Sequence, residues 1–282
     1  KLINFITIDF YFFVPKAKEE YKIFMGKIIA FANQKGGVGK TTTCINLSSY
    51  LAEMGLKILI VDLDPQGNAT TGLGIVKSQL KNSVYNVLID EIPVNTAIIS
   101  TIVENLDILP SDIDLAGAEV ELVYTKEREK VLKKALLSIV KDYDFILIDC
   151  PPSLGLLTIN ALTASNGTVI PIQSEYYALE GLSQLMNNIK LVKRHLNPEL
   201  IVEGVLLTMN DNRATMSKQI AQEVSKFFGK KLYETVIPRN VKLAEAPSFG
   251  IPIMMHDKRS TGAKAYKALA EEFYKKELGE IK

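Results

Sequence analysis

The hydrophobic pattern becomes regular from residue 27 onward, where short runs of Ile, Leu and Val alternate with longer amphipathic stretches. Such alternation is typical of βαβ units, and near-continuous apolar runs are typical of strands buried on both faces. The pattern predicts strands at 27–32, 57–62, 106–109, 144–149, 167–173, 201–208 and 232–237. It predicts helices at 41–54, 115–141 with a break, 155–164, 176–196, 215–228 and 261–278. We therefore expect an α/β fold with a mostly parallel twisted sheet flanked by helices on both faces.

Residues 1–26 do not follow this pattern. Residues 2–14 are largely apolar, but the run is interrupted by Asn4 and Asp9 and is shorter than the ~20 residues that span a bilayer. Met25 and Gly26 stand directly before the first strand. We expect 1–26 to be an N-terminal extension, with 1–24 upstream of a native start at Met25; the alternative is an arm that packs on the domain or on a partner. The rest, 27–282, shows no internal repeat and no Gly/Ser linker, which predicts a single domain.

Composition narrows the class of protein without fixing its function. The chain has 282 residues, is 47% hydrophobic and 23% charged, and contains 2 Cys and 2 His. These cysteines and histidines cannot form a dedicated four-ligand zinc site at any usual spacing. The small number of cysteines favours a reducing, cytoplasmic location. The formal net charge of +1 means that nucleic-acid binding would need a local basic patch, enlarged by dimerisation.

A glycine-rich loop follows the first predicted strand and leads into the first predicted helix. Glycines let a backbone approach phosphate oxygens closely, and a helix N-terminus adds N–H donors and a favourable dipole. We predict a P-loop NTPase in which Lys40 contacts the β- and γ-phosphates of ATP, the Thr41 hydroxyl binds Mg²⁺, and Thr42 reaches the α-phosphate. The nucleotide-binding loop is Lys35, Gly36, Gly37, Val38, Gly39, Lys40, Thr41 and Thr42.

This loop departs from the common pattern G-x-x-x-x-G-K-[ST]. Gln34 stands where the first glycine is expected, and Lys35 adds a second lysine at the start of the loop. Lys35 is well placed to reach the phosphates of a partner subunit and stabilise charge on the transferring phosphoryl group, as an arginine finger does. Hydrolysis would then require an ATP-dependent homodimer. The alternative is a solvated or locally paired lysine.

Three aspartates lie at the ends of predicted strands, where a doubly wound sheet binds its ligands. Asp64 is our candidate for activating the attacking water, since it lies further out in its loop than Asp62. Asp62 is the candidate for orienting the water shell of the metal, although Asp, Pro, Gly and Asn here also suit a capped turn. Asp149 ends an apolar strand in the Walker B manner and is expected to contact Mg²⁺ through water.

These segments together resemble the ParA/Soj partition ATPases, a family with a deviant Walker A loop. The resemblance covers about residues 27–275 and rests on K-G-G-V-G-K-T-T, V-D-L-D-P-Q-G-N-A-T, L-I-D-C-P-P-S-L-G, P-I-Q-S-E-Y-Y-A-L-E-G and P-R-N-V-K-L-A-E-A-P-S-F-G. It implies an ATP-bound sandwich dimer on nonspecific double-stranded DNA, and a ParB-type centromere-binding partner that stimulates hydrolysis and release. It implies a cytoplasmic, nucleoid-associated protein that drives chromosome or plasmid partition.

The resemblance also carries roles for individual residues. It implies that Lys35 acts in trans, that Asp64 is the hydrolytic residue and that Asp149 is the Walker B aspartate. Pro238 and Asn240 match the adenine-side loop of the family. Asn210 is a weaker candidate for contact with the base.

Nonspecific DNA binding needs phosphate contacts from Lys and Arg and weakens as salt rises. The C-terminal third supplies spaced basic residues, of which we select four, each with a solvated surface charge as the alternative. The wider set is Arg213, Lys218, Arg239, Lys242, Lys258 and Arg259, and the selected residues are Lys218, Arg239, Lys242 and Arg259.

Three other functions share parts of this pattern. A MinD-like membrane-cycling ATPase would need a basic amphipathic C-terminal helix, but the glutamates of the last helix balance its lysines, so we expect that helix to pack on the domain. An iron–sulfur ATPase would need cysteines placed to share a cluster, whereas Cys44 and Cys150 suit small buried positions. A ParA-like positioner of a non-DNA cargo would have the same ATPase and stays open.

Overall fold

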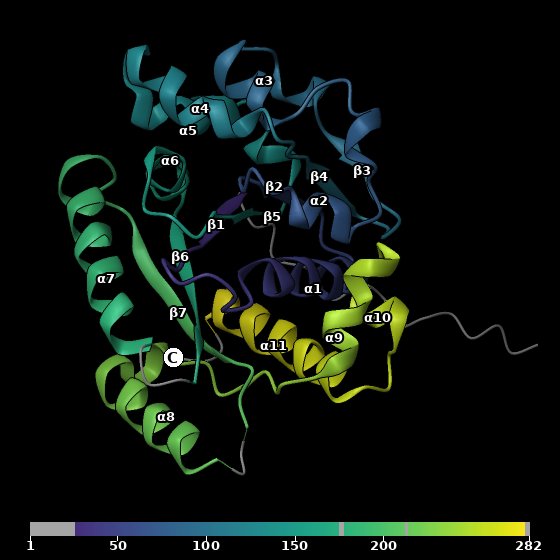
Figure 1. Cartoon of the computed structure of the whole chain (residues 1–282), viewed down its shortest axis with the longest axis vertical. Coiled ribbons are helices and arrows are strands. Elements are labelled where there is room, and N and C mark those ends of the chain that lie inside the picture. The colour runs from purple at the N-terminus through teal and green to yellow at the C-terminus, as the bar shows by residue number, and fades with distance from the viewer. Residues whose placement is uncertain (1–25, 175–177, 212–213, 280–282) are drawn as a thin grey trace, which may run out of the picture.

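The computed structural model describes residues 26–174, 178–211 and 214–279. Its centre is a seven-stranded sheet in the order β3-β4-β2-β5-β1-β6-β7, shown in Figure 1. All neighbouring strands are parallel except β3 and β4, which are antiparallel. The strands are β1 Lys27–Phe31, β2 Ile58–Asp62, β3 Ile99–Ser100, β4 Leu106–Leu109, β5 Phe145–Asp149, β6 Gly167–Gln173 and β7 Ile201–Thr208.

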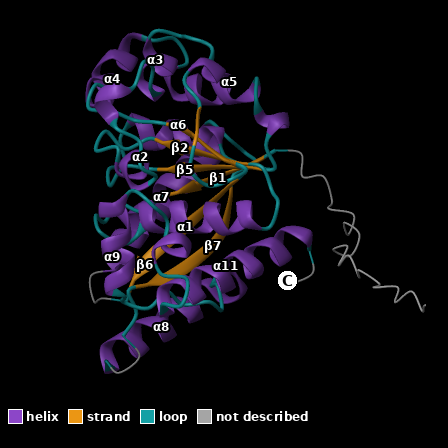
Figure 2. Ribbon diagram, turned by 90° about the vertical axis from the view of Figure 1, so that its right-hand side faces the viewer, coloured by secondary structure: helices purple, strands orange, loops and turns teal. Residues whose placement is uncertain are grey.

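Helices cover both faces of the sheet, so the predicted layering is confirmed (Figure 2). Successive side chains of a strand point to opposite faces, and in β1 Ile28 and Ala30 join one core while Ile29 and Phe31 join the other. One face carries α1 Lys40–Glu53, α2 Asn68–Gly72, α9 Val241–Glu245, α10 Ile253–His256 and α11 Thr261–Leu278. The other carries α3 Val84–Ile89, α4 Leu115–Glu121, α5 Val131–Leu137, α6 Leu156–Ala164, α7 Ala178–His195 and α8 Thr215–Phe228.

Most of the predicted elements are present, with boundaries that move by a residue or two. The predicted helix 115–141 is broken into α4 and α5 with short 3-10 turns between and after them. The predicted strand 232–237 is wrong, because this segment forms only one isolated bridge to β7 in the described structure, between Leu232 and Val205. The main-chain N–H groups of Glu234 and Thr235 donate instead to the Glu272 carboxylate of α11, at 2.8 and 2.9 Å.

Three predictions fall wholly or partly on residues outside the described ranges. Residues 1–25 of the expected N-terminal extension are among them, so the start of the native chain and the role of the extension stay predictions. The beginning of the predicted helix 176–196 and the basic residue Arg213 also lie outside the described residues.

The last helix packs against the domain, as its charge pattern predicts. Leu269 and Phe273 of α11 are 1% exposed, and the Phe273 ring meets Phe145 of β5 edge to face at 5.3 Å. Figures 1 and 2 show α11 beside α1, and the Tyr266 and Thr43 hydroxyls lie 3.1 Å apart between them. In the part of the chain that the structure describes, no helix is long and apolar enough to cross a bilayer.

An ion-pair cluster joins the first strand to the last helix. Lys27 Nζ lies 2.8 Å from the Glu203 carboxylate of β7 and 2.8 Å from the Glu277 carboxylate of α11. Burial favours an uncharged lysine, but the hydrogen bonds to both glutamates outweigh it and raise the Lys27 pKa. We call Lys27, Glu203 and Glu277 the terminal cluster.

Candidate active site

The loop between β1 and α1 is held by the ends of two neighbouring strands. The Asn33 side chain donates to the carbonyl of Pro171 on β6 at 2.7 Å and accepts from the Lys35 N–H at 3.0 Å. The Thr208 hydroxyl, at the end of β7, donates to the Val38 carbonyl at 2.8 Å. Gly37 and Gly39 have φ values of 72° and 84°, which L side chains rarely adopt. The loop therefore has a fixed shape at the carboxyl edge of the sheet.

Lys40 and Thr41 open α1 directly behind this loop. Lys40 is only 6% exposed, and burial lowers its pKa while the neighbouring Asp149 opposes that shift. Its Nζ lies 3.5 Å from the Lys35 carbonyl, so the long side chain curls back over the loop. Gly39 has no side chain to cap the helix, which leaves the positive helix end to attract an anion. This arrangement suits a polyphosphate.

Asp149 ends β5 in the centre of the sheet and is fully buried. No described residue makes a hydrogen bond of standard geometry to either carboxylate oxygen. Burial and the nearby Asp62 raise its pKa well above the usual range, while the Thr41 hydroxyl and Lys40 favour the charged form. A buried carboxylate without such bonds is costly unless a cation balances it. Asp149 and Thr41 therefore fit a Mg²⁺ ion, which accepts hard oxygen ligands and keeps several waters.

Asp62 ends β2 and lies beside Asp149 in the strand register. Its Oδ2 accepts from the Thr70 N–H at 2.8 Å and from the Thr70 hydroxyl at 2.7 Å, and its Oδ1 accepts from the Asp64 N–H at 3.3 Å. Burial raises its pKa to about 6, against the effect of these bonds. Both carboxylate oxygens of Asp62 thus already accept hydrogen bonds from the protein. This is what the alternative from the sequence, in which Asp62 caps a turn, would require. The proposed role of Asp62 toward the metal stays a prediction.

Asp64 lies two residues further on, at the same edge of the sheet, and is 8% exposed. Its Oδ1 accepts from the Gln66 N–H at 2.9 Å. Its main-chain carbonyl accepts from the Gly67 N–H and from the Ser111 hydroxyl, both at 2.8 Å. Both Asp64 and Asp149 are near enough to Lys40 to influence its pKa. The structure thus brings the predicted lysine and aspartates together, while the hydrolytic role of Asp64 stays a prediction.

An apolar cavity of about 190 Å³ opens beside the phosphate loop. Its lining includes Gly39, Thr42 and Thr208 together with Pro238 and Asn240, which suits a purine base next to the phosphates. Asn240, however, already caps α9 by accepting from the Leu243 N–H at 3.2 Å and donates to the Thr261 hydroxyl at 2.7 Å. Its contact with the base stays a prediction.

Asn210 is a neighbour of this cavity rather than part of its described lining. It forms an isolated parallel bridge with Pro238, and its N–H donates to the Ile237 carbonyl at 3.0 Å. This bridge supports the segment that contributes Pro238 to the lining. A direct contact of Asn210 with the base stays a prediction.

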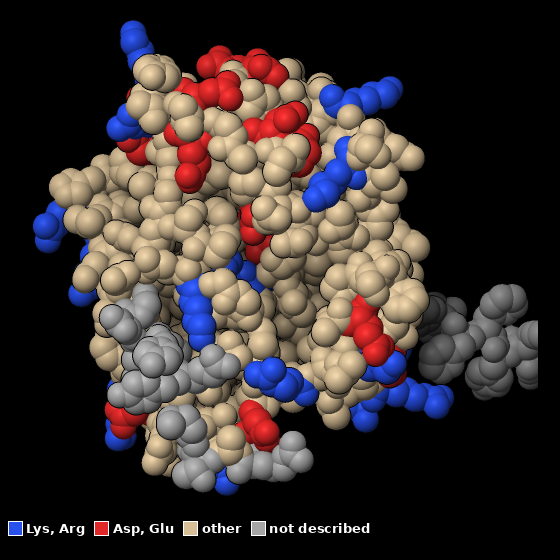
Figure 3. Space-filling model, in the orientation of Figure 1, with Lys and Arg blue, Asp and Glu red and all other residues tan. Residues whose placement is uncertain are grey.

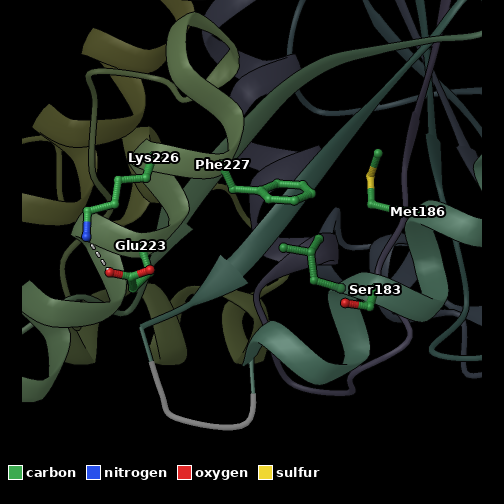
Figure 4. A pocket seen from close by; sticks show the side chains of 6 residues that line it. Ser183, Met186, Glu223, Lys226 and Phe227 are labelled. Carbon is green, nitrogen blue, oxygen red and sulfur yellow. Dashed lines mark hydrogen bonds and ion pairs between the residues drawn. The ribbon is translucent and has the colours of Figure 1, made fainter.

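A second cavity, of about 370 Å³, lies between α7 and α8. Figure 4 shows the Phe227 ring of α8 pointing toward Ser183 and Met186 of α7, with the ion pair between Lys226 and Glu223 at one side. None of the residues that line it belongs to the phosphate loop or to the three aspartates. This cavity therefore has no part in the candidate active site.

The predicted DNA-binding residues are all exposed and come from separate segments of the described chain. Arg239 and Lys242 flank the start of α9, Lys218 is on α8, and Arg259 precedes α11. Lys242 pairs with Glu245 at 2.8 Å, which offsets part of its charge. Figure 3 shows acidic side chains concentrated over the end that carries α3 and α4, and basic ones spread over both halves of the face. Their binding to DNA stays a prediction.

Sequence reasoning did not identify Thr70, Ser111 or Thr208 as parts of the site. Ser111 follows β4 by two residues and Thr208 ends β7, so both lie where parallel strands present polar residues to a ligand. A search for the first polar residue after every predicted strand would have found Ser111, and a search for polar residues that end a predicted strand would have found Thr208. Thr70 lies inside the short helix α2, which the hydrophobic pattern does not predict.

Comparison with known proteins supports the same assignment. A family model described as an AAA domain matches residues 26–202. The sporulation initiation inhibitor protein Soj of Bacillus subtilis is 60% identical over 248 residues, covering 88% of this chain and 98% of that protein. The chromosome partitioning protein ParA of Myxococcus xanthus is 50% identical over 253 residues, covering 90% of this chain and 89% of that protein.

A solved structure adds the ligands of a structural relative. Cobyrinic acid a,c-diamide synthase from Mycobacterium smegmatis, with bound ADP and magnesium, aligns with a TM-score of 0.81 at 37% identity, over 92% of this chain and 98% of that one. The predicted fold and the predicted ATPase class are confirmed, and the predicted ligands ATP and Mg²⁺ agree with the nucleotide and metal of that structure. The phosphate loop, the sheet and the sequence identity to these relatives over nearly the whole domain all agree. The chain therefore belongs to the ParA/Soj family of chromosome-partitioning ATPases.

Proposed function

We propose that this ATPase partitions DNA by cycling between an ATP-bound dimer on nonspecific duplex DNA and a released ADP form. The observation that carries the proposal is the convergence of buried Lys40, buried Asp149 and nearly buried Asp64 at one edge of the sheet, next to a cavity that suits a purine. Such a site holds a nucleoside triphosphate with charge-stabilising groups around its terminal phosphates. The partition role comes from the relatives, which are named for it.

In this proposal each residue has one task in hydrolysis. The loop N–H groups and Lys40 hold the β- and γ-phosphates, and Asp64 accepts a proton from the attacking water. Thr41, and Asp149 through water, would hold Mg²⁺, which would supply positive charge to the terminal phosphates. The phosphate loop contains two lysines with different surroundings: Lys40 is buried and Lys35 is partly exposed. That difference supports a role for Lys35 at the phosphates of a partner subunit.

The proposal includes DNA and a second protein as partners. Exposed Lys218, Arg239, Lys242 and Arg259 would contact DNA phosphates, and a dimer would double their number. A ParB-type partner would stimulate hydrolysis and return the protein to the released form. The protein would then be cytoplasmic and nucleoid-associated while ATP is bound. A MinD-like membrane cycle is less well supported, because α11 buries its apolar face against the domain.

Binding to nonspecific duplex DNA, measured with ATP and with ADP across a salt series, tests the partition proposal. We expect the protein to bind DNA with ATP only, and this binding should weaken steeply as salt rises. Asp64→Ala should stay bound to DNA with ATP, because that variant cannot hydrolyse the nucleotide and return to the released form. Replacing Arg239 and Lys242 by alanine should reduce the salt slope by about one for each DNA phosphate that the variant no longer neutralises. Lys134→Ala, on the other half of the molecule, is the control. ATP hydrolysis without DNA binding in either nucleotide state would contradict the proposal.

A further inference from the structure

A closed ring of hydrogen bonds surrounds the backbone of Asp64. The Asp64 N–H donates to Asp62 Oδ1, and Asp62 Oδ2 accepts from the Thr70 hydroxyl. That hydroxyl accepts in turn from the Ser111 N–H at 2.9 Å, and the Ser111 hydroxyl donates back to the Asp64 carbonyl at 2.8 Å. The ring thus begins and ends on the main chain of one residue.

The ring is shielded from water. Asp62, Thr70 and Ser111 are fully buried and Asp64 is 8% exposed. Hydrogen bonds in such surroundings are stronger than in water, and members of a fully satisfied network hold one another in place. The Thr70 hydroxyl has a single proton, which it gives to Asp62, so its orientation is fixed by the carboxylate.

Three separate segments meet in this ring. Asp62 ends β2, Thr70 lies in α2, and Ser111 follows β4. The loop that carries Asp64 is therefore attached to the sheet on one side by its N–H and on the other by its carbonyl. A displacement of about 1 Å in a reacting group costs on the order of 100-fold in rate, so such double attachment matters for catalysis.

We infer that Thr70 and Ser111 are positioning residues that hold Asp64 at the attacking water. This inference rests on the proposed hydrolytic role of Asp64. Neither hydroxyl touches the phosphate loop in the described hydrogen bonds; each acts through Asp62 or through the main chain of Asp64. Loss of either hydroxyl should therefore slow hydrolysis more than it weakens nucleotide binding.

The test compares Thr70→Val and Ser111→Ala with two matched controls. Thr71→Val removes a neighbouring hydroxyl that donates only to main-chain carbonyls near its own helix, and Ser165→Ala removes a buried hydroxyl that donates to Ala161. We expect kcat for ATP hydrolysis to fall about 10- to 100-fold in the first two variants, with KM for ATP within about 2-fold of the parent. The controls should keep both constants. Thr70→Ser, which retains the hydroxyl, should recover most of kcat.

A double-variant measurement separates positioning from a general loss of structure. If Thr70 acts through Asp64, Asp64→Ala combined with Thr70→Val should be no slower than Asp64→Ala alone. Further slowing would overturn the inference, as would a parallel loss of kcat and ATP affinity, or failure of Thr70→Ser to recover activity. An unchanged kcat in Thr70→Val and Ser111→Ala, with Asp64→Ala inactive, would also overturn it and leave the proposed function standing. An active Asp64→Ala would remove the proposed hydrolytic role of Asp64, on which the inference rests.

Discussion

Replacing Lys27 by methionine should destabilise the domain through the terminal cluster. The substitution keeps most of the side-chain volume but removes the cation that lies 2.8 Å from both glutamates. The Glu277 side chain is 4% exposed and the Glu203 side chain 14%, so two carboxylates would remain close together and largely buried. Breaking a fully buried ion pair costs about 3–5 kcal/mol. Because the Lys27 side chain is 25% exposed, solvent reduces this figure, and we expect about 2–3 kcal/mol.

The loss should depend on pH with a definite sign. Burial and Glu203 raise the pKa of Glu277, and Lys27 opposes that shift. Without the lysine the pKa of Glu277 rises further, and a carboxyl with a raised folded pKa stabilises the fold below that pKa and loses this contribution as pH rises through it. The deficit of Lys27→Met should therefore be small in acid and grow toward neutral pH. The parent should lose the contribution of Lys27 only in strong alkali, as pH rises through its raised pKa.

Urea unfolding at pH 5 and pH 8 measures both effects. Lys134→Met is the control, because Lys134 and its partner Glu127 are 59% and 51% exposed and such a pair contributes less than about 1 kcal/mol. Adding Glu277→Gln to Lys27→Met should recover part of the loss at pH 8, since it removes one of the opposed charges. A loss equal to that of the control, or a deficit that shrinks as pH rises, would refute the electrostatic reasoning.

Three further predictions concern the metal, a close backbone contact and the core. Asp149→Asn should lower ATP turnover by about 100-fold and raise the Mg²⁺ concentration needed for it, measured by Mg²⁺ titration of the ATPase rate; an unchanged titration curve would argue against a metal role. Gly204→Ala should destabilise by about 1–3 kcal/mol in thermal unfolding, because its Cβ would meet the Tyr233 ring, whereas Gly117→Ala, facing only a flexible glutamate, should not. Phe273→Ala should cost about 3–5 kcal/mol in urea unfolding, and a loss below about 1 kcal/mol would mean that α11 is not part of the core.

The sheet and the phosphate loop follow from local patterns, which is why the sequence predicts them well. Buried parallel strands are continuous apolar runs, and the loop must combine glycines with a lysine at fixed spacing. The strand predicted at 232–237 failed because Glu272, nearly forty positions away, bonds the main-chain N–H groups that a sheet would use. The apolar residues of this segment face the core, as those of a strand would. Hydrophobic periodicity, however, cannot reveal a hydrogen-bond acceptor so far along the chain.

The residue types of the site could be predicted from the sequence, but the hydrogen bonds and ion pairs that those residues make were harder to predict. Asp62 and Asp64 both follow the apolar run of β2 at fixed spacing, yet one is bonded by Thr70 and the other by Gln66. The short helix α2 brings Thr70 to Asp62, and its few residues are too short to show a helical period. The basic residues of the C-terminal third illustrate the same limit, since ion pairs such as Lys242 with Glu245 depend on geometry.

The terminal cluster also indicates where another protein or a surface could be attached to the domain. Lys27 begins β1, and the phosphate loop follows the other end of that strand, about 16 Å away for a five-residue strand. Glu277 contacts Lys27, so the start of β1 and the end of α11 lie side by side. They lie at the amino ends of the parallel strands, remote from the nucleotide. A fluorescent protein or a surface tether attached at either point would sit away from the reacting edge. The same adjacency makes the domain a candidate for circular permutation, with a short linker between these points and new ends in an exposed loop.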